Sequence, residues 1–239
     1  MRSMQLTHPN ITRTCNESEV YESLLALDGA SVLELGCGKA EHTRNIAKAH
    51  PGASIVAAEV DAIQHAQNLR SARPSNLTFA DFGAQAIPLP DASIDVVMMF
   101  KSLHHVPVQL QDEALREIHR VLKPGGCAYL SEPVFAGELN ELMRIFNDEE
   151  LVRRAAFEAV QRAVENRLFE LAAEIFFLAP AHYRDFAEFE KKHFQVTHSE
   201  RNVSEAQRSA VERLFNTYLG PGGASLTQQI RVDLLRRVA

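Results

Sequence analysis

The sequence predicts an α/β protein with a doubly wound, mostly parallel sheet of seven strands and helices on both faces. Short apolar runs typical of buried strands alternate with helical segments through the first 133 residues. The first of these runs ends in a turn with two glycines, and polar side chains follow later runs. Because parallel strands end at a common edge, these features predict a ligand site at the carboxyl edge of the sheet.

The first predicted strand, residues 32–35, leads through Gly36-Cys37-Gly38 into a predicted helix at 43–49. Two glycines let the backbone take left-handed conformations and bring bare amides against a ligand. Glu34 adds a carboxylate close to the turn. A dinucleotide-binding fingerprint would need a third glycine where the chain has Glu41, whose charge suits a cationic ligand better than a pyrophosphate.

The second predicted strand covers residues 53–60 and brings Glu59 and Val60 to the same edge. Glu59 lies about twenty residues beyond the glycines, where α/β nucleotide sites place a carboxylate on the ribose hydroxyls. Asp61 is the competing acid, but the helical sequence that follows it favours an N-cap role. A solvated acid at the end of a strand is the other interpretation of Glu59.

Residues 76–100 contain two further predicted strands, at 77–80 and 94–100, separated by a loop with Pro88 and Pro90. The second of these strands is strongly apolar and ends at Phe100. It is expected to border the first strand, at the switch in strand order where open α/β sheets bind ligands.

The heptapeptide KSLHHVP, residues 101–107, follows directly. Lys101, Ser102, His104 and His105 are therefore expected at or near the ligand. A histidine there can act as a general base near neutral pH, or it can simply cap the loop by hydrogen bonding. Lys101 can recognise an anionic group of a substrate.

Residues 114–122 have the spacing of an amphipathic helix, which Pro124-Gly125-Gly126 is expected to end. A fifth strand at 127–131 then delivers Ser131 and Glu132 to the edge that carries the two histidines. Glu132 is either a base or substrate ligand, or a carboxylate held by backbone amides.

These segments resemble the class I S-adenosylmethionine-dependent methyltransferases, above all the small-molecule group that includes the ubiquinone/menaquinone-type enzymes. The family motif E/D-x-G-x-G-x-G stands here as Glu34, Gly36, Gly38 and Ala40, with alanine in place of the third glycine. The resemblance extends over about the first 130 residues. It implies a Rossmann-like fold whose seventh strand is antiparallel and lies between strands five and six.

The resemblance implies S-adenosylmethionine as the cofactor, with Glu59 on both ribose oxygens. The family's Asp-Ala pair, which contacts the adenine, aligns with Gly83-Ala84. The adenine ring would therefore be contacted by Asp81 or by backbone amides. Arg13 would pair with the methionine carboxylate, unless the N-terminal residues are only structural. The expected cofactor-binding residues are Arg13, Glu34, Gly36, Cys37, Gly38, Glu59, Val60, Asp81, Gly83, Ala84, Phe100, Lys101 and Ser102.

Beyond residue 133 the resemblance thins. Helical periodicity from about 137 to 178 predicts a helical insertion between strands five and six that covers the active site. Strand six is expected at 193–198, a helix at 204–219 and strand seven at 226–235. The domain organisation is then an N-terminal segment over the cofactor (1–30), a cofactor-binding core (31–133 and 192–239) and a helical lid (134–191).

Ten of the thirteen phenylalanines fall at or after Phe135. They can line a pocket for an apolar or aromatic acceptor, bury a homodimer surface or form the core of the insertion.

Composition narrows the class of function. A formal net charge of −6 argues against binding along nucleic acid, and no apolar stretch is long enough to cross a membrane. Cys15, Cys37 and Cys127 form no C-x-x-C pair, which suits a reducing cytoplasm and predicts no metal site.

The leading hypothesis is methyl transfer from S-adenosylmethionine to a small molecule, through in-line alignment of the acceptor. The acceptor atom can be O, N, C or S. His104, His105 and Glu132 are the catalytic candidates, needed only if the acceptor must lose a proton. A macromolecular acceptor is less favoured, because the chain has no basic stripe. The alternative from another class is a catalytically silent domain that binds the cofactor as a sensor or assembly partner.

Overall fold

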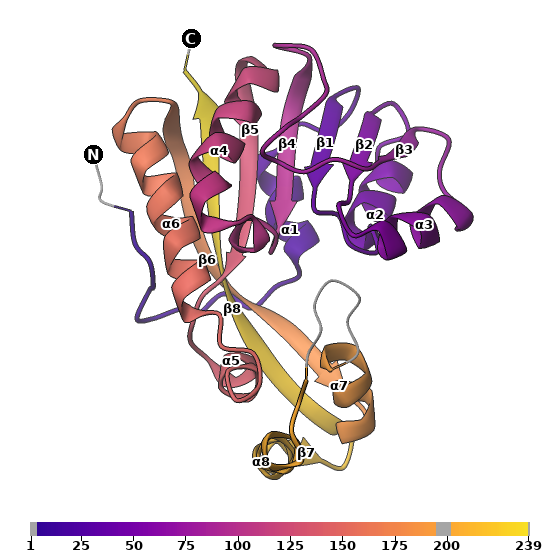
Figure 1. Ribbon diagram of the computed structural model, residues 1–239, viewed down its shortest axis with the longest axis vertical. Helices are drawn as coiled ribbons and strands as arrows, with labels where there is room; N and C mark the ends of the chain where they lie inside the picture. Colours follow the sequence, from indigo (N-terminus) through magenta and orange to yellow (C-terminus); the bar gives the residue numbers. More distant parts are fainter. Residues whose placement is uncertain (1–3, 195–201, 239) are drawn as a thin grey trace.

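The computed structural model describes residues 4–194 and 202–238 and has the predicted α/β architecture (Figure 1). The described residues form one eight-stranded sheet, with seven strands in the order β3-β2-β1-β4-β5-β8-β6 and a short β7 that pairs with β8. The strands are β1 (Ser31–Leu35), β2 (Ser54–Ala58), β3 (Leu77–Ala80), β4 (Ile94–Phe100), β5 (Leu122–Pro133), β6 (Phe169–Tyr183), β7 (Leu219–Gly220) and β8 (Gly223–Arg237).

The first five strands are parallel and the last strand is not. β1 pairs with β2 and β4, β2 with β3, and β4 with β5, all in parallel. β8 lies between β5 and β6 and is antiparallel to both. The predicted fold class is therefore confirmed. Because the strand order reverses between β1 and β4, the loops after these two strands meet at the carboxyl edge.

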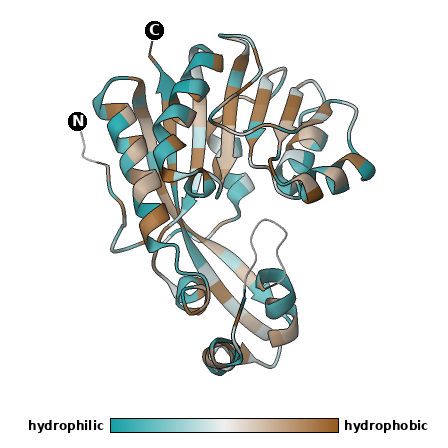
Figure 2. Cartoon of the chain, viewed as in Figure 1, coloured by the Kyte–Doolittle hydropathy of each residue, from teal (hydrophilic) through white to brown (hydrophobic). Residues whose placement is uncertain are grey.

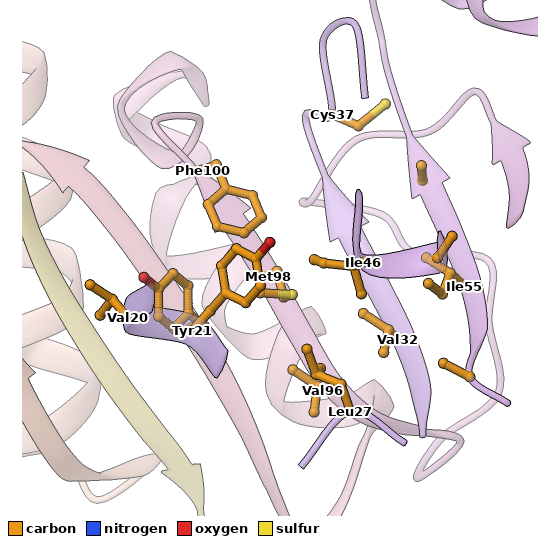
Figure 3. Packing of buried hydrophobic residues seen from close by; sticks show 14 of the residues in the cluster. Val20, Tyr21, Leu27, Val32, Cys37, Ile46, Ile55, Val96, Met98 and Phe100 are labelled. Carbon is orange, nitrogen blue, oxygen red and sulfur yellow. The ribbon is translucent and has the colours of Figure 1, made fainter. Parts of the chain in front are cut away.

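Helices cover both faces of the sheet, and each face has its own apolar core. On one face Tyr21 and Ile46, from α1 and α2, pack with Met98 (Figure 3). On the other face α4 and α6 pack over Leu33 and Val97. Figure 2 shows hydrophobic residues, in brown, along much of the sheet and hydrophilic residues, in teal, on the helices that cover it. The helices are α1 (Glu17–Leu24), α2 (Glu41–Ala49), α3 (Ala62–Arg70), α4 (Gln111–Val121), α5 (Glu138–Met143), α6 (Glu150–Glu165), α7 (Phe186–His193) and α8 (Glu205–Asn216), with 3-10 turns η1 (Leu103–His105) and η2 (Val108–Leu110).

β5 begins at Leu122, so Pro124-Gly125-Gly126 lies inside the strand and does not form the predicted turn. Leu122 pairs with Ile94, and the register then shifts before the regular pairing of β4 with β5. A Cβ at Gly126 would lie 2.9 Å from the carbonyl oxygen of Asp95. Glycine therefore lets the two backbones approach each other where the strand pairing is irregular.

The prediction of a helix continuing to residue 178 is wrong. α6 ends at Glu165, and β6 pairs with β8 along its length. Arg167 takes a left-handed φ of 58° between the helix and the strand. The apolar residues of this segment fit the periodicity of a helix and of a strand, and pairing with the distant strand β8 favours the strand.

The sixth strand is thus β6 and not residues 193–198. His193 is the last residue of α7, and residues 195–198 lie outside the described part of the chain. The insertion after β5 contains α5 and α6, and a second helical segment with α7 and α8 lies between β6 and β8. α8 and β8 correspond to the helix and strand predicted at 204–219 and 226–235.

α5, α7, α8 and the adjoining ends of β6 and β8 form a small cap beyond the carboxyl edge of the sheet (Figure 1). Late phenylalanines fill its core, as one of the three interpretations above expected. The core residues are Leu139, Leu142, Tyr183, Phe186, Phe189, Val211, Phe215, Ala224 and Leu226. No helix in residues 4–194 and 202–238 has the length and apolar character needed to cross a membrane.

Candidate cofactor-binding and active site

The turn after β1 takes left-handed conformations at three of its residues. φ is +70° at Gly36, +52° at Gly38 and 55° at Ala40, the residue that precedes α2. A Cβ at Gly36 would lie 2.7 Å from Cβ of Ser102, whereas one at Gly38 would meet nothing within 4 Å. Gly36 is therefore required by contact with the loop after β4, and Gly38 by backbone conformation alone.

The expectation of bare amides at the two glycines is wrong, because the amides of Gly36, Cys37 and Gly38 are bound within the protein. The amides of Gly36 and Cys37 donate to the carbonyl of Ala58 at 2.9 and 3.0 Å. The amide of Gly38 donates to Oε2 of Glu59 at 2.6 Å. The turn is thus fastened to the end of β2, and ligand binding at this turn stays a prediction.

Glu34 and Glu59 are two buried carboxylates beside this turn, 3% and 8% exposed. Burial and the charge of Glu59 raise the pKa of Glu34 well above its ordinary value, against a hydrogen bond from the backbone of Thr43. Among the described residues, Oε2 of Glu34 has no hydrogen-bond partner. Glu59 accepts from the amides of Gly38 and Asp61. Neighbouring buried acids bound by amides rather than by Lys or Arg favour a cationic, hydroxyl-bearing ligand.

β2 and β3 end side by side, which brings Glu59 next to Asp81 along the edge. The amide of Glu59 donates to the carbonyl of Ala80 at 3.0 Å, and Asp81 follows with an exposed side chain. Val60 is 67% exposed at the same edge. The predicted ribose and adenine contacts therefore share one surface, although their contact with a cofactor stays a prediction. The loop after β3 contains the two remaining predicted residues, Gly83 and buried Ala84.

Phe100 ends β4 inside an aromatic cluster, which Figure 3 shows in part. The ring of His42 stacks on Phe100 with centroids 4.3 Å apart, and Tyr21 and Tyr129 lie at 5.9 and 5.6 Å. Burial and the charge of Lys101 lower the pKa of His42 to about 4, so this ring is neutral at pH 7. Residues from α1, α2, β4 and β5 thus enclose the end of β4.

Lys101 and Ser102 tie the loop after β4 to its neighbours. The amide of Lys101, at a left-handed φ of 56°, donates to the carbonyl of Ser131 at 2.7 Å. The hydroxyl of Ser102 donates to the carbonyl of Leu35 at 2.8 Å. Burial lowers the pKa of Lys101, against the attraction of Glu17. The amino group of Lys101 thus lies near the carboxylate of Glu17, and its recognition of an anionic substrate group stays a prediction.

The structure brings His104 and Glu132 together as a buried pair. Oε1 of Glu132 accepts from the amide of Leu103 at 2.9 Å, and its Oε2 forms a short hydrogen bond with Nδ1 of His104. Burial would raise the pKa of Glu132, but its contacts with His104 lower it overall. Nε2 of His104 lies 3.8 Å from Oε2 of Glu149. His105 is exposed, with its ring 4.1 Å from that of His104.

The pairing of His104 with Glu132 separates the roles of the two histidines. A carboxylate at Nδ1 favours the tautomer that carries its proton there and leaves the lone pair on Nε2. The ring of His104 is therefore held in one orientation, whereas His105 lies at the surface.

Two acids at the starts of helices lie near this edge and were not among the residues predicted from the sequence. Glu149 immediately precedes α6, and Arg153 of α6 donates to it at 2.7 Å. Glu17, the first residue of α1, is 7% exposed and accepts from the hydroxyl of Tyr129 at 2.6 Å. Burial raises the pKa of Glu17. In the sequence such acids look like ordinary helix-start residues, so no local signal separates them from the others.

Arg13 lies on a segment that pairs with the edge strand β6. The amide of Leu178 donates to the carbonyl of Arg13 at 2.8 Å, and Cys15 donates back to Leu178 at 3.2 Å. The exposed side chain of Arg13 lines a hollow of about 610 Å³ with His8 and Phe176. None of these contacts brings Arg13 to the glycine turn, and its role at a methionine carboxylate stays a prediction.

Comparison with known proteins agrees with this geometry. Residues 32–126 match a family model described as a methyltransferase domain. The ubiquinone/menaquinone biosynthesis C-methyltransferase UbiE of Hahella chejuensis is 35% identical over 103 residues, 41% of this chain and 41% of that protein. A fatty-acid O-methyltransferase of Mycolicibacterium smegmatis is 30% identical over 176 residues, 70% of this chain and 63% of that protein. The chain thus spans less than two thirds of either relative.

Solved structures show the same fold. The YcgJ protein of Bacillus subtilis superimposes with a TM-score of 0.62 over 93% of this chain and 97% of that chain, at 16% identity. Family model, relatives and fold together confirm the resemblance seen in the sequence. Residues 32–126 thus form a methyltransferase domain similar to those of the class I enzymes, whose cofactor is S-adenosylmethionine.

Proposed function

We propose that this protein transfers the methyl group of S-adenosylmethionine to a hydroxyl oxygen of a small molecule. The observation that carries the proposal is one edge of the sheet that holds both the buried acids Glu34 and Glu59 and the oriented base His104. Acids of this kind suit a cationic cofactor, and a base is needed where an acceptor must lose a proton.

The cofactor, when bound, supplies an electrophilic methyl group on a sulfonium, so the protein has chiefly to position the acceptor. Glu34 lies close to the glycine turn, where the positive charge of a bound cofactor would lower its raised pKa and favour the carboxylate. Glu59 accepts hydrogen bonds from the ribose hydroxyls, and the amides of Gly38 and Asp61 keep its carboxylate in place. Positioning of this sort accounts for several kcal/mol of a reaction barrier.

On the acceptor side, Nε2 of His104 takes the hydroxyl proton. The carboxylate of Glu132 at Nδ1 orients the ring and stabilises the positive charge that forms on it. Lys101 attracts an acceptor that also carries an anionic group. Both named relatives support a small organic acceptor, and one of them is named as an O-methyltransferase.

The cap serves as the lid that selects the acceptor. It follows the carboxyl end of β5, where Glu132 lies, and the chain within it has its own core. If the cap selects the acceptor, the residues that bind the cofactor can stay the same whichever acceptor is used. The free thiols of Cys15, Cys37 and Cys127 support the further proposal that the protein works in the cytoplasm.

Label transfer tests the proposal. The protein is incubated with S-adenosylmethionine labelled on its methyl group and a panel of phenols, hydroxy fatty acids and carboxylic acids. We expect transfer to a hydroxyl group. His104→Gln and Glu132→Gln should each lower kcat by roughly 10²–10⁴-fold while the cofactor Kd is kept.

Glu165→Gln, at the exposed last residue of α6 and outside the cap, is the control and should leave kcat unchanged. Cofactor binding without transfer to any member of the panel would favour the silent sensor domain. Transfer that survives both site substitutions would refute the role of the base.

A further inference from the structure

Within the part of the chain that the structure describes, the side chains of His104, His105 and Glu149 bring three possible metal-ligand atoms within 4.8 Å of one another. We propose that these three residues bind a divalent transition-metal ion with the preferences of Zn²⁺. The inference goes beyond methyl transfer and is carried by the geometry of the side chains. It also departs from the expectation, drawn from cysteine spacing, that the chain has no metal site.

His104 is already held in the way that a metal-binding histidine is held. It is 4% exposed, and Nδ1 binds the carboxylate of Glu132, which also accepts from the amide of Leu103. A carboxylate on one ring nitrogen fixes the orientation of the ring and raises the basicity of the other nitrogen. Nε2 is thereby presented as a preformed ligand atom.

The spacing of Glu149 fits a shared ion. Its Oε2 lies 3.8 Å from Nε2 of His104, beyond the range of an ordinary hydrogen bond. Two ligands of a tetrahedral zinc, each about 2.1 Å from the ion, are roughly 3.4 Å apart. A shift of a few tenths of an ångström would therefore bring these two atoms to the separation of zinc ligands. Asn147 and Arg153 hold the carboxylate, and the positive charge of Arg153 is expected to weaken metal binding.

His105 completes the set from the solvent side. Its exposed ring lies 4.1 Å from that of His104, so an ion can enter past it. Two imidazoles and one carboxylate suit zinc better than Mg²⁺ or Ca²⁺, which prefer oxygen ligands. Three protein ligands also leave one position open for water.

The ion would take the lone pair on Nε2 of His104 that the proposed methyl transfer uses for a proton. Metal binding and proton transfer at His104 are therefore mutually exclusive, and zinc is expected to inhibit the reaction. Binding itself needs neither cofactor nor acceptor, so it can be measured apart from the proposed activity.

Calorimetric titration of the chelator-stripped full chain with ZnCl₂, without cofactor, tests the site. We expect one equivalent to bind with a micromolar Kd. His105→Ala and Glu149→Gln should each weaken binding by roughly tenfold or more. His182→Ala, at an exposed histidine of β6, should not.

Absence of micromolar binding to the wild type, or equal binding by the wild type and His105→Ala, would overturn the proposal. Circular dichroism of each variant shows whether it is folded. If Glu149→Gln does not fold, His105→Ala decides alone, because its side chain is at the surface. A failure of methyl transfer would leave the zinc result unaffected.

Discussion

Gly36→Ala should destabilise the protein and weaken cofactor binding more than any other single methyl group added to the glycine turn. The left-handed φ of +70° costs an L-residue about 1–2 kcal/mol. The new Cβ would lie 2.7 Å from Cβ of Ser102, and overpacking of this kind costs about 1–3 kcal/mol. The expected loss of unfolding free energy is the sum, about 2–5 kcal/mol.

Gly38→Ala is the matched control in the same turn. Its φ of +52° imposes the same conformational cost, but nothing lies within 4 Å of the added Cβ. The expected loss is therefore only about 1–2 kcal/mol. Urea unfolding of the two variants measures the difference, which isolates the contact with the loop after β4.

Ser102→Gly in the Gly36→Ala background removes the opposing Cβ. A double-mutant cycle should show a favourable coupling of about 1 kcal/mol or more between the two substitutions. Equal destabilisation by Gly36→Ala and Gly38→Ala, together with no coupling, would refute the argument that Gly36 is needed for packing.

Two further predictions concern stability. The pKa of His42 is lowered from 6.5 to about 4 in the folded protein, so between these pH values the folded state binds fewer protons than the unfolded state. The free energy of unfolding should therefore fall by up to about 3 kcal/mol on acidification from pH 6.5 to 4. His42→Gln should flatten this dependence, and an unchanged profile would exclude His42 as its source. Phe189→Ala, in the fully buried core of the cap, should cost about 3–5 kcal/mol in thermal or urea unfolding. A cost below about 1 kcal/mol would show that the cap core contributes little to stability.

The sequence predicted the first half of the sheet closely because its signals are local. β3 and β4 have the predicted bounds, since each is an apolar run flanked by loop residues. Glu59, Ser102 and His104 could be placed at one edge because parallel strands end together. The hydrogen bonds of the glycine turn could not be predicted, because its amides donate to the end of β2, which is distant in the sequence.

The second half depends on contacts between distant segments. β6 is a strand because it pairs with β8, and no residue before Pro180 excludes the helix that was predicted to reach residue 178. Glu149 reaches His104 only because α6 packs beside η1. The conformation of Ala40 could not be predicted from the sequence either. Its φ of 55° is left-handed, which explains why the family motif has a glycine at this position.

Calorimetric titration with S-adenosylmethionine and its demethylated product, on the wild type and Glu59→Gln, tests the assigned cofactor site most directly. Glu113→Gln, at a half-buried position in the first turn of α4, makes the same chemical change away from the glycine turn. We expect micromolar binding to the wild type and to Glu113→Gln, and binding at least tenfold weaker to Glu59→Gln, because removing a partner of a charged hydrogen bond costs about 1.5–3 kcal/mol. No binding to the wild type, or equal binding by all three proteins, would contradict the placement of the cofactor beside Glu59.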